Sequence, residues 1–312
     1  MASSSKVFPF LGVCFLLLLP SIIQSKPLKN PFGFIQHLEG CHKGQTVKGL
    51  QDLKRYLEKF GYLNYDQVIN KGKKNHATDD QFDDLLESAI KTYQRRHHLK
   101  ATGGLDAKTV NQMMKPRCGV PDIVNGTSRQ HNRKSMSIHT VGRYRFFPGS
   151  PRWPPTQTHL RYRFLSGVQV PGTENLRSIC AQAFQRWAQV SHFTFEEVTD
   201  NAVAEIEIGF HGTQGRDGND RGFDGPLGTV AHATSPPGGR FHYDVDENWS
   251  SNPGPSEVDL ESIAVHEIGH LLGLHHSEVP EAIMFDTYEV GTTKRDLHAD
   301  DIQGIRTLYG LQ

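Results

Sequence analysis

Apolar residues recur at helical spacing through the first part of the chain. Leucines three or four residues apart predict a short helix over 49–57, which Gly61 ends. The same periodicity predicts a longer helix over 78–97 and a third helix that begins at Asp106 and ends before Pro116. Because each helix carries one apolar stripe, this part is predicted to form a small helical bundle.

The second part of the chain mixes two periodicities. Apolar and polar residues alternate over 160–164 and over 206–210, which predicts two strands, and helical spacing returns over 176–190 between them. A polar stretch without periodicity begins at Ile123 and separates the two parts, and such exposed linkers are where proteases cut. The remaining predicted elements are short strands at 228–234 and 240–244, a helix that begins near Glu257 with Ser256 and Asp259 as a capping box, and a last helix over 300–308.

The N-terminus has the features of a secretory signal. Lys6 precedes an apolar run over 7–19, and small or polar residues over 21–25 offer a cleavage zone. The run is shorter than the roughly 20 residues that span a bilayer, and no other segment is long and apolar enough. We therefore expect a secreted protein without a membrane anchor. Because 34 basic residues balance 34 acidic ones, the composition gives no reason to expect a nucleic acid as partner.

Cysteine usage leaves one thiol to explain. Without the signal segment, Cys41, Cys118 and Cys180 remain, and an odd number in a secreted protein leaves at least one thiol outside disulfides. Cys180 falls within a predicted helix, where a buried inert thiol is the simplest interpretation, and the sequence assigns no role to Cys41. Two glycosylation sequons, at Asn125 and Asn248, are compatible with the secretory route.

The penultimate predicted helix carries two histidines one turn apart. His266 and His270 lie on the same helix face, so both rings can reach one metal ion. Glu267 lies beside His266, where a carboxylate can take a proton from the attacking water. Gly273 can end the helix in the left-handed conformation, so that the chain doubles back and supplies His276 as third ligand. Three imidazoles leave one tetrahedral position open, as in catalytic zinc sites.

Met284 follows the third histidine by eight residues. The extended histidine motif together with this methionine resembles the metzincin clan, in which the methionine forms a turn beneath the zinc. The resemblance implies a zinc-dependent endopeptidase. In such an enzyme the metal activates a water and Glu267 takes its proton as the water attacks a peptide carbonyl.

A cysteine motif closes the helical first part. Residues 116–122 read Pro-Arg-Cys-Gly-Val-Pro-Asp, which matches the latency motif of matrix metalloproteinases, and from about Leu38 onward the chain resembles a matrix metalloproteinase of the plant type. This resemblance implies that Cys118 ligates the catalytic zinc in an inactive precursor. A thiolate is a strong zinc ligand and displaces the water that the chemistry needs. Arg117 and Asp122 are expected to pair and hold the segment in place.

The resemblance also implies the domain organisation and an α+β fold. A metzincin catalytic domain, with a twisted and mostly parallel sheet, an antiparallel edge strand and three helices, is expected to follow a small helical pro-domain similar to peptidoglycan-binding domains. Cleavage around 139–144 would release the catalytic domain, whose new N-terminal ammonium would pair with Asp300 or Asp301. The expected segments are a signal peptide at 1–25, a pro-domain at 26–138 with its cysteine switch at 116–122 and its activation linker at 123–138, and the catalytic domain at 139–312.

Calcium is a further cofactor that the resemblance implies. Asp224, Asp244 and Glu247 match the calcium-binding segments of the family, and carboxylates with loop carbonyls are the ligands that this cation requires. A solvated turn is the alternative for such a loop.

A second, structural zinc is less well matched. His232 and His242 correspond to two of its ligands, but Asp217 and Asn219 stand where the family has a His-x-Asp pair. His211 is a candidate substitute in a shifted register. Since zinc sites normally need four good ligands, the sequence leaves occupancy of this site open.

Substrate contacts are implied in two places. A peptide is expected to lie extended along the strand that contains Ala231, by strand addition. Tyr288 matches the wall and Ser262 the floor of a specificity pocket, while Asp286 stands where the family usually has proline.

Two other functions fit part of the sequence. A cell-wall-binding module would explain residues 38–115 and nothing beyond them. A zinc-binding but inactive receptor is disfavoured because Glu267 is present. The expected partners are therefore extracellular protein substrates, together with an activating protease or a second copy of the chain itself.

Overall fold

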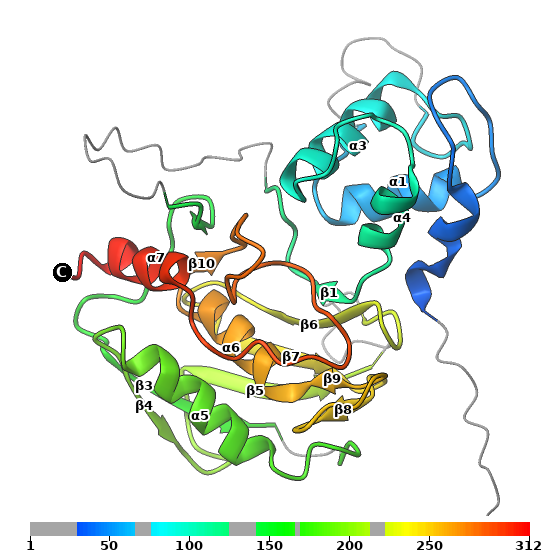
Figure 1. Cartoon of the computed structure of the whole chain (residues 1–312). Coiled ribbons are helices and arrows are strands. Elements are labelled where there is room, and N and C mark those ends of the chain that lie inside the picture. Colours follow the sequence, from blue (N-terminus) through cyan, green and yellow to red (C-terminus); the bar gives the residue numbers. More distant parts are fainter. Residues whose placement is uncertain (1–29, 66–75, 125–141, 166–168, 213–221) are drawn as a thin grey trace, which may run out of the picture.

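A computed structural model describes residues 30–65, 76–124, 142–165, 169–212 and 222–312. The expected signal peptide and most of the expected activation linker lie outside these residues. Figure 1 shows a helical domain, drawn in blue and cyan, that lies against a larger domain built around one sheet. The segment that contains Cys118 lies where the two domains meet.

The helical domain packs short helices around its own apolar core. Leu50, Leu57 and Tyr93 are buried at its centre, as the predicted stripes require. The longer helix begins six residues later than predicted, because the Asp83 side chain caps it by accepting a hydrogen bond from the Leu86 N–H. The helices are the 3-10 helix η1 (Pro31–Leu38), which the sequence did not predict, and α1 (Leu50–Lys59), α3 (Asp84–Arg96) and α4 (Ala107–Met113).

A six-stranded sheet organises the larger domain. Its order is β1-β6-β7-β5-β3-β4, and every neighbouring pair is parallel except β6 with β7. Strand β6 is therefore an antiparallel edge of the larger domain's own sheet, as expected, and β1 from the cysteine motif extends that edge. The strands are β1 (Arg117–Cys118), β3 (His159–Phe164), β4 (Thr194–Glu197), β5 (Ile206–His211), β6 (Thr229–Ala233) and β7 (Arg240–Asp244).

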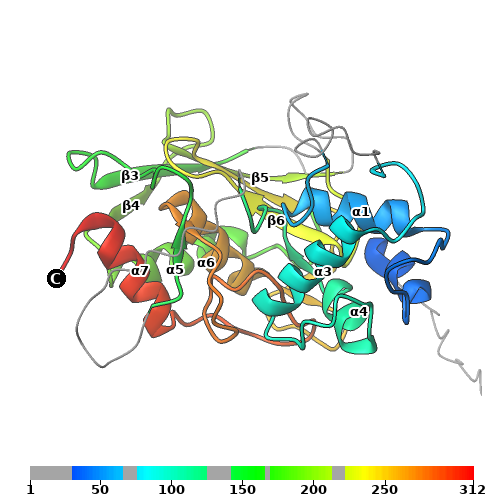
Figure 2. The same cartoon turned by 90° about the horizontal axis from the view of Figure 1, so that it is seen from above.

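Two helices cover one face of this sheet. Helices α5 (Leu176–Ala188) and α6 (Leu260–Leu271) pack against each other beneath the strands (Figure 2), and Trp187 of α5 donates its indole N–H to the Val265 carbonyl of α6. The capping box predicted at Ser256 is wrong. Asp259 is the N-cap, since its carboxylate accepts a hydrogen bond from the Ser262 N–H, and Ser256 lies in a turn before the extended Val258.

The third helix closes the opposite end of the domain. Helix α7 (Ala299–Tyr309) begins at His298, where His298 and Asp301 form a reciprocal capping box.

Among the described residues, no helix is both long and apolar enough to cross a membrane. The short strands form two further pairs, β2 (Arg145–Phe146) with β10 (Leu274–His275), and β8 (Trp249–Ser250) with β9 (Val258–Asp259).

Candidate active site and its covering segment

The three predicted zinc ligands converge in a buried site. Helix α6 supplies His266 and His270, and the turn after it supplies His276. Gly273 ends the helix with a φ of 100°, which is the left-handed turn that the sequence predicted. One ligand atom from each histidine and the Cys118 thiol lie within 4.8 Å of one another.

Hydrogen bonds fix which nitrogen of each ring faces the site. His266 Nδ1 lies 2.7 Å from the Ile283 carbonyl oxygen, and His270 Nδ1 lies 2.8 Å from the Leu274 carbonyl oxygen. Nδ1 of His276 lies 2.7 Å from the Asp122 carboxylate. With Nδ1 as the donor, each Nε2 keeps its lone pair and faces the centre, which is the orientation that metal-binding histidines need.

Burial keeps the three imidazoles neutral. It lowers the pKa of His270 to about 4 and the pKa values of His266 and His276 well below their usual range. Neutral imidazoles are the form that binds metal. The donor set of three such rings and one thiol suits zinc.

Glu267 is fully buried beside the Cys118 thiol. Neither carboxylate oxygen makes a hydrogen bond of ordinary geometry with a described residue, and burial raises the pKa of Glu267 to about 8. A buried carboxylate without such partners is positioned to take up a proton from a group that enters the site.

Met284 packs beneath helix α6, between His266 and His270. Gly269 faces Met284 so closely that a Cβ at position 269 would lie well inside contact distance of the Met284 sulfur. Asp301 accepts hydrogen bonds from the backbone N–H groups of Ile283 and Met284, so α7 holds this turn in place.

The cysteine motif occupies the cleft as an extended strand. On one side, β1 runs parallel to β6, and the Gly119 N–H donates to the Ala231 carbonyl at 2.8 Å. On the other side, the Cys118 N–H donates to the Asp286 carbonyl at 3.0 Å, and the Tyr288 N–H donates to the Pro116 carbonyl at 2.8 Å. The strand therefore fills a slot between β6 and the wall segment 286–289, with the Cys118 sulfur 3.5 Å from His270 Nε2.

An ion pair within the cysteine motif stabilises the conformation of this strand. Arg117 donates to Asp122 at 2.8 Å, and both side chains are fully buried, as the sequence predicted. The Arg117 guanidinium also lies 3.5 Å from the ring centroid of Phe60 in the helical domain. Burial alone would raise the pKa of Asp122, but the positive charges of Arg117 and Arg96 hold this pKa well below its usual range.

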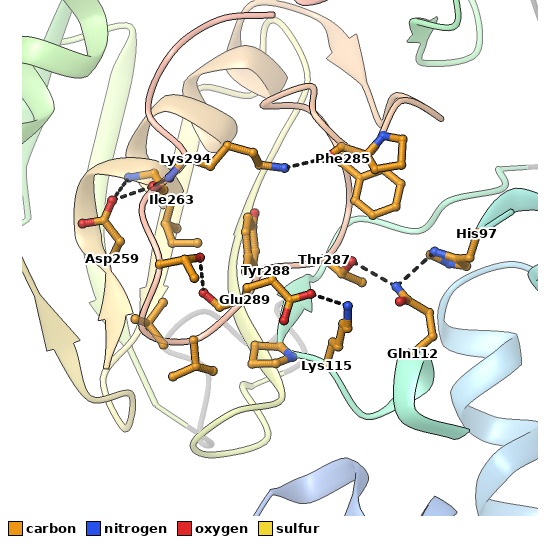
Figure 3. Close-up of a pocket in the computed structure, with 16 residues that line it drawn as sticks. His97, Gln112, Lys115, Asp259, Ile263, Phe285, Thr287, Tyr288, Glu289 and Lys294 are labelled. Atoms are coloured by element: carbon orange, nitrogen blue, oxygen red, sulfur yellow. Dashed lines mark hydrogen bonds and ion pairs between the residues drawn. The ribbon is translucent and has the colours of Figure 1, made fainter. Parts of the chain in front are cut away.

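A pocket of about 260 Å³ opens beside the site. Tyr288 and Ser262, both predicted, line it together with Ile263. The Ser262 hydroxyl is not free within it, since it donates to Asp259 and accepts from the Lys294 N–H. In Figure 3, Lys115 of the helical domain points to Glu289, and Gln112 lies between His97 and Thr287.

The predicted calcium ligands lie at one end of the β6–β7 pair: Asp224 precedes the start of β6, Asp244 is the last residue of β7, and Glu247 follows it. Asp244 and Glu247 are buried, and each has one carboxylate oxygen without a hydrogen-bond partner among the described residues. Burial and neighbouring carboxylates raise the pKa of Asp244 to about 7 and that of Glu247 to about 8. Asp224 instead bonds to Thr229 and forms an ion pair with Lys59 of the helical domain.

The candidates for the second zinc also come together. His232 Nε2 lies 3.2 Å from His242 Nδ1, and the His211 ring stacks on His242 with centroids 3.7 Å apart. Asp217 and Asn219 lie outside the described residues.

Sequence reasoning missed two basic residues at the domain boundary, Arg96 and His97, and their contacts with Asp122 and Asp286. Arg96 lies 3.8 Å from Asp122 and 3.5 Å from Asp286, and His97 lies 3.6 Å from Asp286. All four residues are buried. The one available signal was an acidic residue at position 286, where the family usually has proline.

Comparisons with known proteins agree with this architecture. The family model described as matrixin matches residues 152–310, and the model of a putative peptidoglycan binding domain matches residues 46–113. The chain is 45% identical to metalloendoproteinase 2-MMP of Arabidopsis thaliana over 87% of this chain and 73% of the relative. It is 43% identical to metalloendoproteinase 5-MMP of the same plant, over 90% and 77%. It is 36% identical to the interstitial collagenase of Sus scrofa, over 83% and 49%.

A buried three-histidine site on a helix beneath a mixed sheet, with these relatives, defines a zinc metalloendopeptidase. The chain belongs to the matrixin family, with a helical domain of peptidoglycan-binding type before the matrixin domain.

Proposed function

We propose that this protein is a secreted endopeptidase of extracellular proteins, made as a latent precursor in which Cys118 occupies the catalytic zinc site. One observation carries the proposal: the Cys118 sulfur shares a 4.8 Å cluster with the ligand nitrogens of His266, His270 and His276. The expected signal segment supports secretion. The helical domain makes the contacts that hold Cys118 in place, which favours a role in latency over glycan binding.

His266, His270 and His276 are the proposed zinc ligands in the active form. The residues fit the ion, because the three neutral rings aim Nε2 inward and His276 Nε2 has no other described partner. Zinc at this position supplies a Lewis acid that polarises a peptide carbonyl and makes a water acidic enough to react near neutral pH.

Glu267 is the proposed general base. Its carboxylate takes the proton of the attacking water and passes it to the amine that leaves. Its position on α6 next to His266, fully buried at the site, places the carboxylate where it can hold the proton between the two steps. Met284 supports the ligand helix from below.

Substrate is proposed to take the place of β1. The free edge of β6 at Ala231 offers backbone hydrogen bonds on one side, and the wall segment offers those of Asp286 and Tyr288 on the other. The pocket lined by Ser262 and Tyr288 then receives one substrate side chain.

Two further metal sites are proposed for the folded loops. The orphaned oxygens of Asp244 and Glu247 support a calcium ion there, with Asp224 as a third ligand once Lys59 has left. The cluster of His232, His242 and His211 supports a structural zinc.

Activation is proposed to begin with cleavage after the linker, around residues 139–144. Of the two candidate carboxylates for the new N-terminus, Asp300 fits better, because it accepts a hydrogen bond from the Arg143 N–H at 2.6 Å. Asp301 is engaged by the backbone of the turn that contains Met284. Another protease or a second copy of the enzyme performs the cleavage.

Latency is tested by replacing the thiol. A serine hydroxyl stays protonated near neutral pH and binds zinc far more weakly than cysteine does. Purified Cys118→Ser precursor should therefore trim itself and hydrolyse a fluorogenic peptide without a mercurial activator, as followed by gel and N-terminal sequencing. Cys41→Ser is the matched control, because Cys41 is buried in the helical domain and far from the ligand cluster. A Cys118→Ser precursor that stays full length and inactive would overturn the latency proposal.

A further inference from the structure

Asp286 projects from the wall segment 286–289 into the domain boundary. Its side chain is fully buried, and the basic side chains within ion-pair distance of it among the described residues all come from the helical domain and the cysteine motif. Arg96 and Arg117 are cationic, whereas burial lowers the pKa of His97 well below its usual range. Arg96 Nε lies 3.5 Å, Arg117 Nη2 3.6 Å and His97 Nε2 3.6 Å from the carboxylate. When these groups leave on activation, the carboxylate loses both guanidinium partners, while Lys294 of the larger domain still acts on it at longer range.

The strand that fills the cleft already presents a basic side chain to this carboxylate. Arg117 is flanked by the backbone hydrogen bonds of Pro116 and Cys118 to the wall segment. Its guanidinium extends from the strand toward Asp286. Two residues earlier, in the bend between α4 and β1, Lys115 forms an ion pair with Glu289 of the same wall. The wall thus contacts two basic side chains of this segment, Lys115 and Arg117, through acidic side chains.

A metal ion does not explain this carboxylate. Ligand atoms of His97, Asp122 and Asp286 lie within 4.8 Å of one another, which by distance alone would suit a cation. Two buried guanidinium groups, those of Arg96 and Arg117, already contribute positive charge to the same space. A further cation would be repelled there, so the geometry is that of a carboxylate site for a basic side chain.

We propose that, in the activated enzyme, Asp286 binds an arginine or lysine side chain of the substrate and makes the cleft selective for basic residues near the scissile bond. The inference rests on the endopeptidase activity. A substrate strand in the place of β1 meets the same backbone groups of Asp286 and Tyr288. A substrate side chain that points out of the cleft as Arg117 does reaches the Asp286 carboxylate. Asp122, the closer partner of Arg117, leaves with the cysteine motif, so a substrate arginine has Asp286 to itself.

The test compares arginine with its neutral isostere. Full-length wild-type precursor is activated with a mercurial, and kcat/KM is measured on fluorogenic peptides that carry arginine or citrulline at each of the positions that flank the scissile bond. At one position arginine should be preferred by roughly three- to tenfold, the effect of one partly exposed ion pair, and the preference should shrink in high salt. If arginine is preferred at none of these positions, the inference is overturned. This comparison uses only the wild-type protein, so it does not depend on the folding of a variant.

Variants then assign the preference to Asp286. The preference should disappear in Asp286→Asn and persist in Asp286→Glu, because Asp286→Asn should lower kcat/KM on the arginine peptide more than on the citrulline peptide. Asp296→Asn is the matched control, because Asp296 is an exposed acidic residue that pairs with Arg186 away from the cleft. A preference that survives in Asp286→Asn overturns the inference while leaving the endopeptidase activity intact. Failure to cut either peptide series overturns both.

Discussion

Gly269 shows how closely the ligand helix depends on a single residue. It lies between the two histidines of α6 and faces Met284 and Trp187 in the core. A Cβ at this position would lie 2.9 Å from Cζ2 of Trp187 and closer still to the Met284 sulfur. The glycine therefore lets the Met284 turn pack directly beneath the metal site.

Gly269→Ala should destabilise the protein by about 1–3 kcal/mol, because an extra methyl group in a close-packed core forces its neighbours to move. It should also weaken zinc binding, because the added methyl group would displace the turn of α6 that carries His266 and His270. Thermal melts and zinc titration measure the two effects. Gly254→Ala is the control, because its Cβ would meet nothing closer than 3.5 Å. An unchanged melting temperature and zinc affinity in Gly269→Ala would contradict this packing argument.

The residues of the site were predictable to different degrees. His266, Glu267 and His270 lie on one helix, so their spacing alone places them together. Cys118 was assigned through the resemblance of its flanking motif. The bond from His276 to Asp122 joins residues 154 positions apart, and the contacts of Asp286 depend on how two domains dock. Neither follows from local sequence patterns.

At the scale of elements, the existence of helices and strands was easier to predict than their ends. The predicted starts of α3 and α6 are too early, because the Asp83 and Asp259 side chains cap the helices at positions that apolar periodicity does not mark. The alternation of apolar residues identified β3 and β5 correctly. The pairing of β1 with β6 joins two domains and could be anticipated only as strand addition by a substrate.

The loops after β5 and β7 lead to a prediction about calcium. Asp244 and Glu247 are buried carboxylates with unsatisfied oxygens, and a bound cation would offset their repulsion. A calcium-selective chelator should lower the melting temperature of the activated enzyme by several degrees, as expected when a ligand that binds only the folded state is removed. The peptidase rate should fall with it, and added calcium should restore both. An unchanged melting temperature and rate would remove calcium from the account.

At the scale of the whole molecule, we propose that the helical domain blocks the enzyme in two ways. It places a thiol among the zinc ligands and a strand in the substrate cleft, and the buried pair of Arg117 and Asp122 holds both. The charges of Arg96 and Lys59 extend the contact to Asp286 and Asp224. In the proposed activation, departure of one domain would therefore open the metal site, the β6 edge and the acidic wall together.

The central claim is that Glu267 acts as the base beside a zinc held by three histidines. The direct measurement is the zinc content and the kcat of the activated Glu267→Gln enzyme on a fluorogenic peptide. Glutamine keeps the size of the side chain but cannot accept the proton, so zinc content and melting temperature should match those of the wild type. At the same time kcat should fall by about 10²–10⁴-fold, the usual contribution of a general base. A variant that keeps its zinc and retains near wild-type kcat would contradict the account.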